Sequence, residues 1–159
     1  MDTTEFWRRG DRSELFTLPM GNGIVLENRW EDYIKQGYDY HWYSSFGTIV
    51  MTNTAGQETT LLESQCMALN PPNDCWLCML GPVLVEVVNE RYFLFEWRGY
   101  GLVQSSVFDI QTMQEHRIDI DGNWYVMFAT QDENVFYFYT WTGDEREPAQ
   151  FIAVEITLP

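Results

Sequence analysis

Three cysteines are the residues of this 159-residue chain that could bind a metal ion. Cys66, Cys75 and Cys78 follow a C-x8-C-x2-C pattern, and thiolates separated by two residues can both reach a zinc ion. A fourth ligand is missing, because neither His41 nor His116 lies at a zinc-finger spacing. The "CWLC" segment is also embedded in apolar residues that suit a buried strand. We therefore predict structural cysteines, and neither a metal nor another cofactor.

A second group of residues could support acid–base catalysis. Asp39 and His41 lie two positions apart and would share one face of a strand, with Ser44 and Ser45 close by in the sequence. Neither serine lies in the G-x-S-x-G turn that exposes a hydrolase nucleophile. We predict an outward polar face here and assign no catalytic residue.

Acidic side chains dominate the composition. The chain carries 24 Asp and Glu against 9 Lys and Arg, which gives a formal charge of −15 at pH 7. From residue 101 onward the only basic residues are Arg117 and Arg146. Such a charge repels nucleic acid backbones and anionic lipid surfaces, and it attracts basic proteins. We therefore expect a basic protein partner, with no direct nucleic acid binding and no membrane binding.

Most of the chain is predicted to form strands, because β-branched and aromatic residues fill short runs between Gly, Asn and Asp clusters. The expected strands cover residues 38–52, 58–67, 76–88, 91–97, 102–110, 115–120, 124–130, 134–141 and 150–158. Their connections are too short for crossover helices, so consecutive strands should pair antiparallel as a meander. We predict an all-β single domain over residues 1–159, in which residues 38–159 form a two-layer sandwich or a closed barrel. A small four-bladed propeller is an alternative.

The N-terminal segment, residues 1–37, is predicted to be less regular than the meander. Two short strands are expected around Gly21, Asn22 and Gly23. The sequence "RWEDYIKQG" from Arg29 to Gly37 has the pattern of about two turns of helix ended by glycine. The fold would then contain at most one or two short helices.

The turns of the meander determine which acidic residues gather. The sequence "DIDGN" at 119–123 contains the Asp-Gly pair of a tight hairpin and would join strands 115–120 and 124–130. Alternate turns emerge at the same end of a sheet, so this turn should share a rim with "TGDEREP" at 142–148. The rim would gather five carboxylates, Asp119, Asp121, Asp144, Glu145 and Glu147.

The strand "VFYFYTW", residues 135–141, presents aromatic side chains on both of its faces. We predict that Phe136 and Phe138 belong to the core and that Tyr137, Tyr139 and Trp141 are less completely buried. Tyrosine and tryptophan beside acidic groups are favoured in binding hot spots. We assign these three residues, with the five rim carboxylates, to partner binding.

Together these features predict a small, acidic, non-enzymatic protein that neutralises a basic protein by covering its functional surface. Toxin immunity proteins, nuclease inhibitors and nucleic acid mimics work on this principle, although acidic turns also serve plain solubility. The alternative is a β-barrel or β-sandwich carbohydrate-active hydrolase with paired carboxylates. An odd number of cysteines and a polar N-terminal sequence favour the cytoplasm. The odd thiol and the sheet edges would permit a homodimer.

Overall fold

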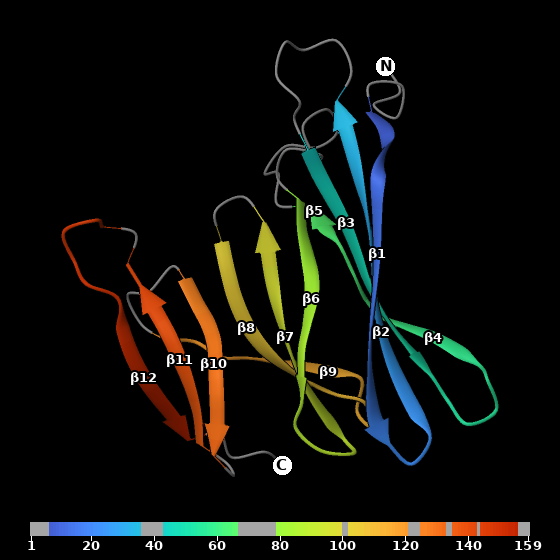
Figure 1. Cartoon of the computed structure of the whole chain (residues 1–159). Coiled ribbons are helices and arrows are strands. Elements are labelled where there is room, and N and C mark those ends of the chain that lie inside the picture. Colours follow the sequence, from blue (N-terminus) through green and yellow to red (C-terminus); the bar gives the residue numbers. More distant parts are fainter. Residues whose placement is uncertain are drawn as a thin grey trace.

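The computed structural model describes residues 7–35, 43–66, 79–99, 102–120, 125–132, 135–142 and 144–155. These residues form strands joined by turns and loops and contain no helix, and therefore none long and apolar enough to cross a membrane (Figure 1). One sheet has four strands in the order β1-β2-β3-β4. The other has eight, in the order β12-β11-β10-β8-β7-β6-β5, with β9 beside β8. The predicted all-β meander is confirmed, and neither sheet closes into a barrel or divides into propeller blades within the described ranges.

Most predicted strands of the meander lie close to where the sequence placed them. The four-stranded sheet consists of β1 (Trp7–Gly21), β2 (Ile24–Lys35), β3 (Tyr43–Thr52) and β4 (Glu58–Glu63). The first strands of the other sheet are β5 (Gln65–Cys66), β6 (Met79–Val87), β7 (Tyr92–Gly99), β8 (Leu102–Asp109) and β9 (Gln114–Arg117). Its last three strands are β10 (Tyr125–Asp132), β11 (Val135–Trp141) and β12 (Gln150–Glu155), which we call the C-terminal layer.

Residues 7–35 of the N-terminal segment form a long regular hairpin, so the predictions of a less regular segment and of a helix from Arg29 to Gly37 are wrong over this range. Residues up to Lys35 belong to β2, which pairs with β1 on one side and with β3 on the other. Two neighbouring strands satisfy the backbone groups that a helix would have satisfied internally, so tertiary pairing overrides the local pattern. Asn22 and Gly23 both have positive φ, as a two-residue turn of type I′ requires.

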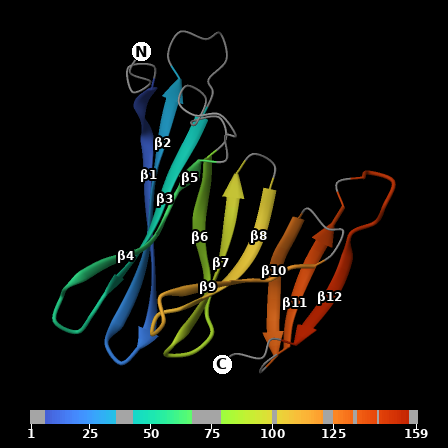
Figure 2. The same cartoon turned by 180° about the vertical axis from the view of Figure 1, so that it is seen from behind.

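The central strands β6, β7 and β8 are covered on both faces. One face packs against the four-stranded sheet in a core that includes Leu26, Ile49, Phe93 and Phe95. The opposite face packs against the C-terminal layer, in a second core of Tyr92, Leu94, Val107, Ile118, Val126, Phe136 and Phe138. Figures 1 and 2 show the three groups of strands side by side from both directions. Sandwich packing therefore occurs twice, which explains why β7 is buried from Tyr92 to Trp97 without alternation.

The predicted hairpin between strands 115–120 and 124–130 does not form. β9 pairs antiparallel with β8 over Ser106–Asp109, whereas β10 meets β8 in parallel register at Tyr125 and Val103. Both strands therefore border β8 and are not paired with each other. This arrangement places the C-terminal layer over the second face of the central strands, where its apolar side chains are removed from water.

Side chains replace a neighbouring strand along part of β6. The described ladder between β6 and β5 covers only Met79 and Leu80. Further along β6, the amide of Asn28 donates to the Pro82 carbonyl at 3.0 Å and accepts the Leu84 N–H at 2.9 Å. Asn28 is fully buried in β2 and also donates to the carbonyl of Thr48. One amide thus completes the edge of β6 and links the two sheets.

Buried side chains also bond to the backbone of β10, whose described ladder with β8 is limited to Tyr125. Glu96 and Ser105 are directly opposite each other on β7 and β8, and both are buried. The Glu96 carboxylate accepts the Phe128 N–H at 2.8 Å, and the Ser105 hydroxyl donates to the Val126 carbonyl at 2.7 Å. These two bonds connect the C-terminal layer to the central strands where no ladder does so.

Candidate functional site: the open face of the C-terminal layer

The C-terminal layer has one buried face and one exposed face. Along β11, Phe136, Phe138 and Thr140 are buried, whereas Tyr137 and Trp141 are half-buried and Tyr139 is 49% exposed. The predicted division between the core phenylalanines and the less buried Tyr and Trp side chains is confirmed. The reason is the two-residue period of a strand, which directs alternate side chains to the second core and to solvent.

Strand register adds residues from β10 and β12 to the exposed side. Tyr139 lies opposite Met127 on β10 and Phe151 on β12, and Tyr137 lies opposite Ala153. Met127 is 40% exposed and Phe151 is 62% exposed. We call this surface the open face and define it by Met127, Thr130, Asp132, Val135, Tyr137, Tyr139, Trp141, Ala149, Phe151, Ala153 and Glu155.

The open face gathers much of the apolar surface that the described residues leave in contact with water. Five large apolar side chains are exposed among those residues, and three of them, Met127, Tyr139 and Phe151, lie here. The rings of Tyr137 and Phe151 stack with centroids 6.1 Å apart. Clustered apolar exposure of this kind, unlike scattered single residues, marks a surface suited to binding.

Carboxylates lie at both ends of the open face. At one end, Asp132 and Glu155 are each paired in register with Val135, and both are exposed. At the other end, β11 leads into the loop that carries Asp144, Glu145 and Glu147. Between residues 125 and 155 the sequence has six acidic residues and a single base, Arg146. The open face is therefore an aromatic strip between two acidic ends.

The acidic loop after β11 is held by its own hydrogen bonds. The Asp144 carboxylate accepts the backbone N–H and the guanidinium of Arg146, with distances of 2.6 to 2.9 Å. The Arg146 side chain thereby holds the pKa of Asp144 below its usual range. Thr142 donates its hydroxyl to Glu147 at 2.7 Å. The indole N–H of Trp141 donates to the Asp144 carbonyl at 3.1 Å, so the loop also orients this ring.

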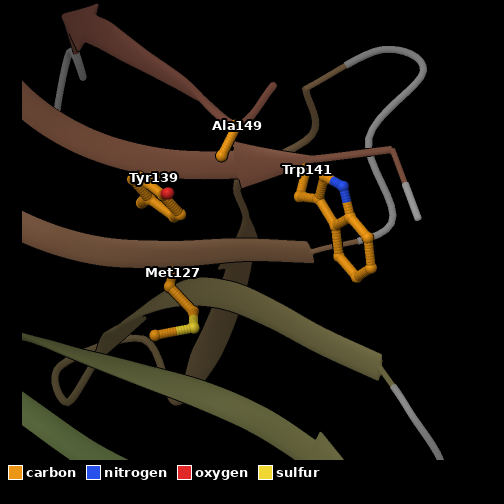
Figure 3. Close-up of a pocket in the computed structure, with 4 residues that line it drawn as sticks. All are labelled: Met127, Tyr139, Trp141 and Ala149. Atoms are coloured by element: carbon orange, nitrogen blue, oxygen red, sulfur yellow. The ribbon is translucent and has the colours of Figure 1, made fainter. Parts of the chain in front are cut away.

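A pocket of about 350 Å³ opens on this face beside the acidic loop. Met127, Tyr139, Trp141 and Ala149 line it, and Figure 3 shows the small side chain of Ala149 between the Tyr139 and Trp141 rings. The lining therefore combines two aromatic rings, a thioether and a methyl group. Such walls suit an apolar or planar cationic group rather than a reaction between carboxylates.

The predicted rim is only partly represented among the described residues. Asp144, Glu145 and Glu147 do lie together in one loop. Asp119 is exposed after β9 and forms an ion pair with Arg117 at 2.9 Å. The hairpin between strands 115–120 and 124–130, which would have placed it on the same rim as that loop, does not form. Asp121 lies outside the described residues, so its place at the site stays a prediction.

Sequence reasoning found Tyr137, Tyr139 and Trp141 and missed the other residues of the open face, among them Met127, Asp132, Phe151 and Glu155. Each depends on strand register, which an irregularity between Phe128 and Thr130 shifts on β10. A period-two pattern of exposed and half-buried residues does run along β12, yet the length of the 142–149 connection does not fix its register against β11.

The other candidate sites of the sequence are only partly covered by the described residues. Asp39, His41, Cys75 and Cys78 lie outside the described residues. Within the described ranges there is no group of three or more His, Cys, Asp and Glu side chains placed to hold a metal ion. The described carboxyl groups with shifted pKa values, Glu58, Asp109 and Asp144, are all shifted downward, in each case chiefly by hydrogen bonds from an arginine. A general acid would need the opposite shift.

Comparison of the chain with protein-family models, with curated proteins and with solved structures found no significant match.

Proposed function

We propose that this chain is a non-enzymatic binding protein that neutralises a basic protein by covering its functional surface with the open face. The observation that supports the proposal most strongly is the position of Met127, Tyr139 and Phe151. These exposed side chains lie on adjacent strands between two acidic ends. Interface cores are rich in aromatic residues and methionine, and polar groups surround them.

Charge gives this surface its selectivity for a basic partner. The whole chain carries a formal charge of −15, and the only base in the C-terminal layer and its loops, Arg146, is already paired with Asp144. Carboxylates at both ends of the open face would attract cationic surfaces during the encounter and repel acidic ones. The aromatic strip would then slow dissociation after docking.

The partner class follows from this combination. Proteins that act on nucleic acids, nuclease toxins among them, expose cationic surfaces that bind phosphates. An acidic protein that occupies such a surface would block it, as toxin immunity proteins, nuclease inhibitors and nucleic acid mimics do. We place this activity in the cytoplasm, because an odd number of cysteines fits a reducing compartment.

The alternative of a carbohydrate-active hydrolase finds less support. A glycosidase needs two carboxyl groups about 5 to 10 Å apart around the bond that it cleaves. Among the described residues, no carboxylate lines the pocket on the open face. Its aromatic walls could still stack against a sugar ring, so a sugar is included among the probes used below.

Affinity capture with matched variants tests the proposal. Lysate of the source organism is passed over the immobilised protein at low salt and eluted with a salt gradient. One variant, Tyr139→Ser with Phe151→Ser, removes the aromatic strip and keeps every carboxylate. A second variant, Asp132→Asn with Glu145→Gln and Glu155→Gln, removes charge and keeps the aromatic strip. Phe16→Ser changes an exposed aromatic residue of β1, which lies on the opposite side of the molecule from β12 (Figure 1).

We expect one discrete basic protein to be retained by the wild type and by the Phe16 variant, and to be lost or weakly held by the other two. With that protein purified, the charge variant should associate more slowly and with a smaller salt dependence, whereas the aromatic variant should dissociate faster. Equal retention on all four columns would show that a different surface binds.

A further inference from the structure

The structure contains a feature that would select one kind of side chain on the basic partner. We infer that the pocket formed by Met127, Tyr139, Trp141 and Ala149 receives an arginine side chain of that partner. The inference rests on the proposed function and adds to it the chemical group that is recognised.

The size of the pocket fits a single side chain. Its volume is about 350 Å³, near the lower end of the roughly 300 to 1,000 Å³ typical of pockets that bury small ligands. It opens on the exposed face of the layer. A side chain projecting from a docked protein can enter from that direction.

The chemistry of the walls favours a guanidinium group. Tyr139 is 49% exposed, so its ring offers a face on which a flat cation can stack. Trp141 is held in orientation by its hydrogen bond to the Asp144 carbonyl. Guanidinium is planar and more weakly hydrated than an ammonium ion, so it loses less hydration free energy when it enters an aromatic site.

The electrostatic surroundings favour a cation over a neutral group. The pocket lies where β11 meets the loop of Asp144, Glu145 and Glu147, and Glu145 is exposed there. The chain's own arginine in this loop does not fill the pocket, because the Arg146 side chain is 89% exposed and bound to Asp144. The site therefore combines a negative loop with aromatic walls, and the one base of that loop, Arg146, is bound to Asp144.

Four matched peptides test this inference on the full chain. Each has the form acetyl-Gly-Gly-X-Gly-Gly-amide, where X is arginine, lysine, citrulline or norleucine, and methyl glucoside is added as a sugar probe. The protein carries 5-fluorotryptophan, and the variant Trp141→Phe identifies the Trp141 fluorine resonance. Titration at low salt then gives an affinity for each probe from the shift of that resonance.

We expect the arginine peptide to shift the Trp141 resonance saturably and to bind about two- to five-fold more tightly than the citrulline peptide, the range set by one exposed cation–π contact. The affinity of the lysine peptide should lie between those of the arginine and citrulline peptides. Tyr139→Leu should remove the preference for arginine, and because this side chain is half exposed, the variant should keep its fold. Glu145→Gln should weaken binding of the arginine peptide and leave binding of the citrulline peptide unchanged. Phe16→Leu should change the affinity of neither peptide.

Several results would overturn the inference. These are equal affinities for arginine and citrulline, tighter binding of norleucine or methyl glucoside, or no shift with any probe. The proposed function fails separately, by the capture experiment. A captured basic protein that still binds the Tyr139→Leu variant, but is lost from the Asp132, Glu145 and Glu155 variant, would leave the proposed function standing and reject the arginine pocket.

Discussion

The carboxylate of Glu96 on β7 accepts the backbone N–H of Phe128 on β10 at 2.8 Å, although the two residues belong to strands that share no ladder. Ser105, opposite Glu96, donates to the carbonyl two residues earlier on β10. Asn28 forms the same pattern with a carbonyl and an N–H two residues apart on β6. At both layer boundaries, buried polar side chains of one layer therefore satisfy a strand edge of the next.

Substitution of Glu96 tests how much its hydrogen bond to the Phe128 N–H contributes to the stability of the protein. Glu96→Gln keeps an acceptor for the Phe128 N–H and loses the charged pair with Arg98, so we expect a loss of about 1 kcal/mol in the free energy of unfolding. Glu96→Leu removes the acceptor of the Phe128 N–H as well as the partner of Arg98, and should cost about 3 kcal/mol. Urea denaturation measures both. Glu86→Gln, at an exposed position of β6, should stay within about 0.5 kcal/mol. Equal stability of the Gln and Leu variants would show that the N–H finds another acceptor.

Asn28→Asp should destabilise the protein in a pH-dependent manner. An ionised carboxylate cannot donate to the Pro82 and Thr48 carbonyls, and it is buried beside them, so we expect a loss of about 3 kcal/mol or more at pH 7. Burial beside carbonyls raises the folded-state pKa of the new carboxyl above its unfolded value. The defect is therefore complete above the folded pKa and shrinks as the pH falls below it, because the protonated acid can donate again.

The matched control for this experiment is Asn53→Asp at the turn between β3 and β4. Asn53 accepts the N–H groups of Ala55 and Gln57 through its side-chain oxygen, a role that aspartate can also fill. Its stability should change by no more than about 0.5 kcal/mol. A constant defect of Asn28→Asp between pH 7 and pH 4, relative to wild type, would contradict the proposed geometry.

Asp109 should contribute to stability at neutral pH and lose that contribution in acid. Its buried carboxylate accepts two hydrogen bonds from the Arg91 guanidinium, at 2.9 and 2.6 Å, and these hold its pKa well below the usual range. A lowered folded-state pKa adds stability above the unfolded pKa of about 3.9, and that stability is lost as the pH falls toward the folded value. Asp109→Asn should therefore be less stable than wild type at pH 7, and the gap should narrow below about pH 4.

Asp144 provides the comparison for this titration. It also pairs with an arginine, but its partner Arg146 is almost fully exposed, so solvent screens the interaction. Asp144→Asn should therefore lower the free energy of unfolding at pH 7 by clearly less than Asp109→Asn does. Equal stability losses in the two variants would show that burial does not strengthen the pair between Arg91 and Asp109.

Truncation of two phenylalanines of the C-terminal layer should destabilise the protein to very different extents. Phe138 is fully buried in the second core, so Phe138→Ala should lower the free energy of unfolding by about 3 to 5 kcal/mol. Phe151 is 62% exposed, and Phe151→Ala should cost less than about 1 kcal/mol. Urea denaturation of the two variants measures the difference. Similar losses would mean that the open face is covered in solution, for example by a second copy of the chain.

The sequence by itself determined most strands of the meander and the faces of β11. Runs of β-branched and aromatic residues placed most strands of the meander, and the two-residue period separated Phe136 and Phe138 from Tyr139 because that period is a local property of an extended chain. The excess of acidic residues is likewise independent of the fold.

Only the tertiary structure decided which elements became neighbours. The segment after Arg29 became a strand because β1 and β3 pair with it, and Asp132 and Glu155 came to flank the aromatic strip through the register of β10 and β12. The burial of Glu96 likewise depends on β10 crossing the face of β7. Such contacts join residues far apart in the sequence, and their free energy comes from burying both faces of the central strands at once, which no local pattern records.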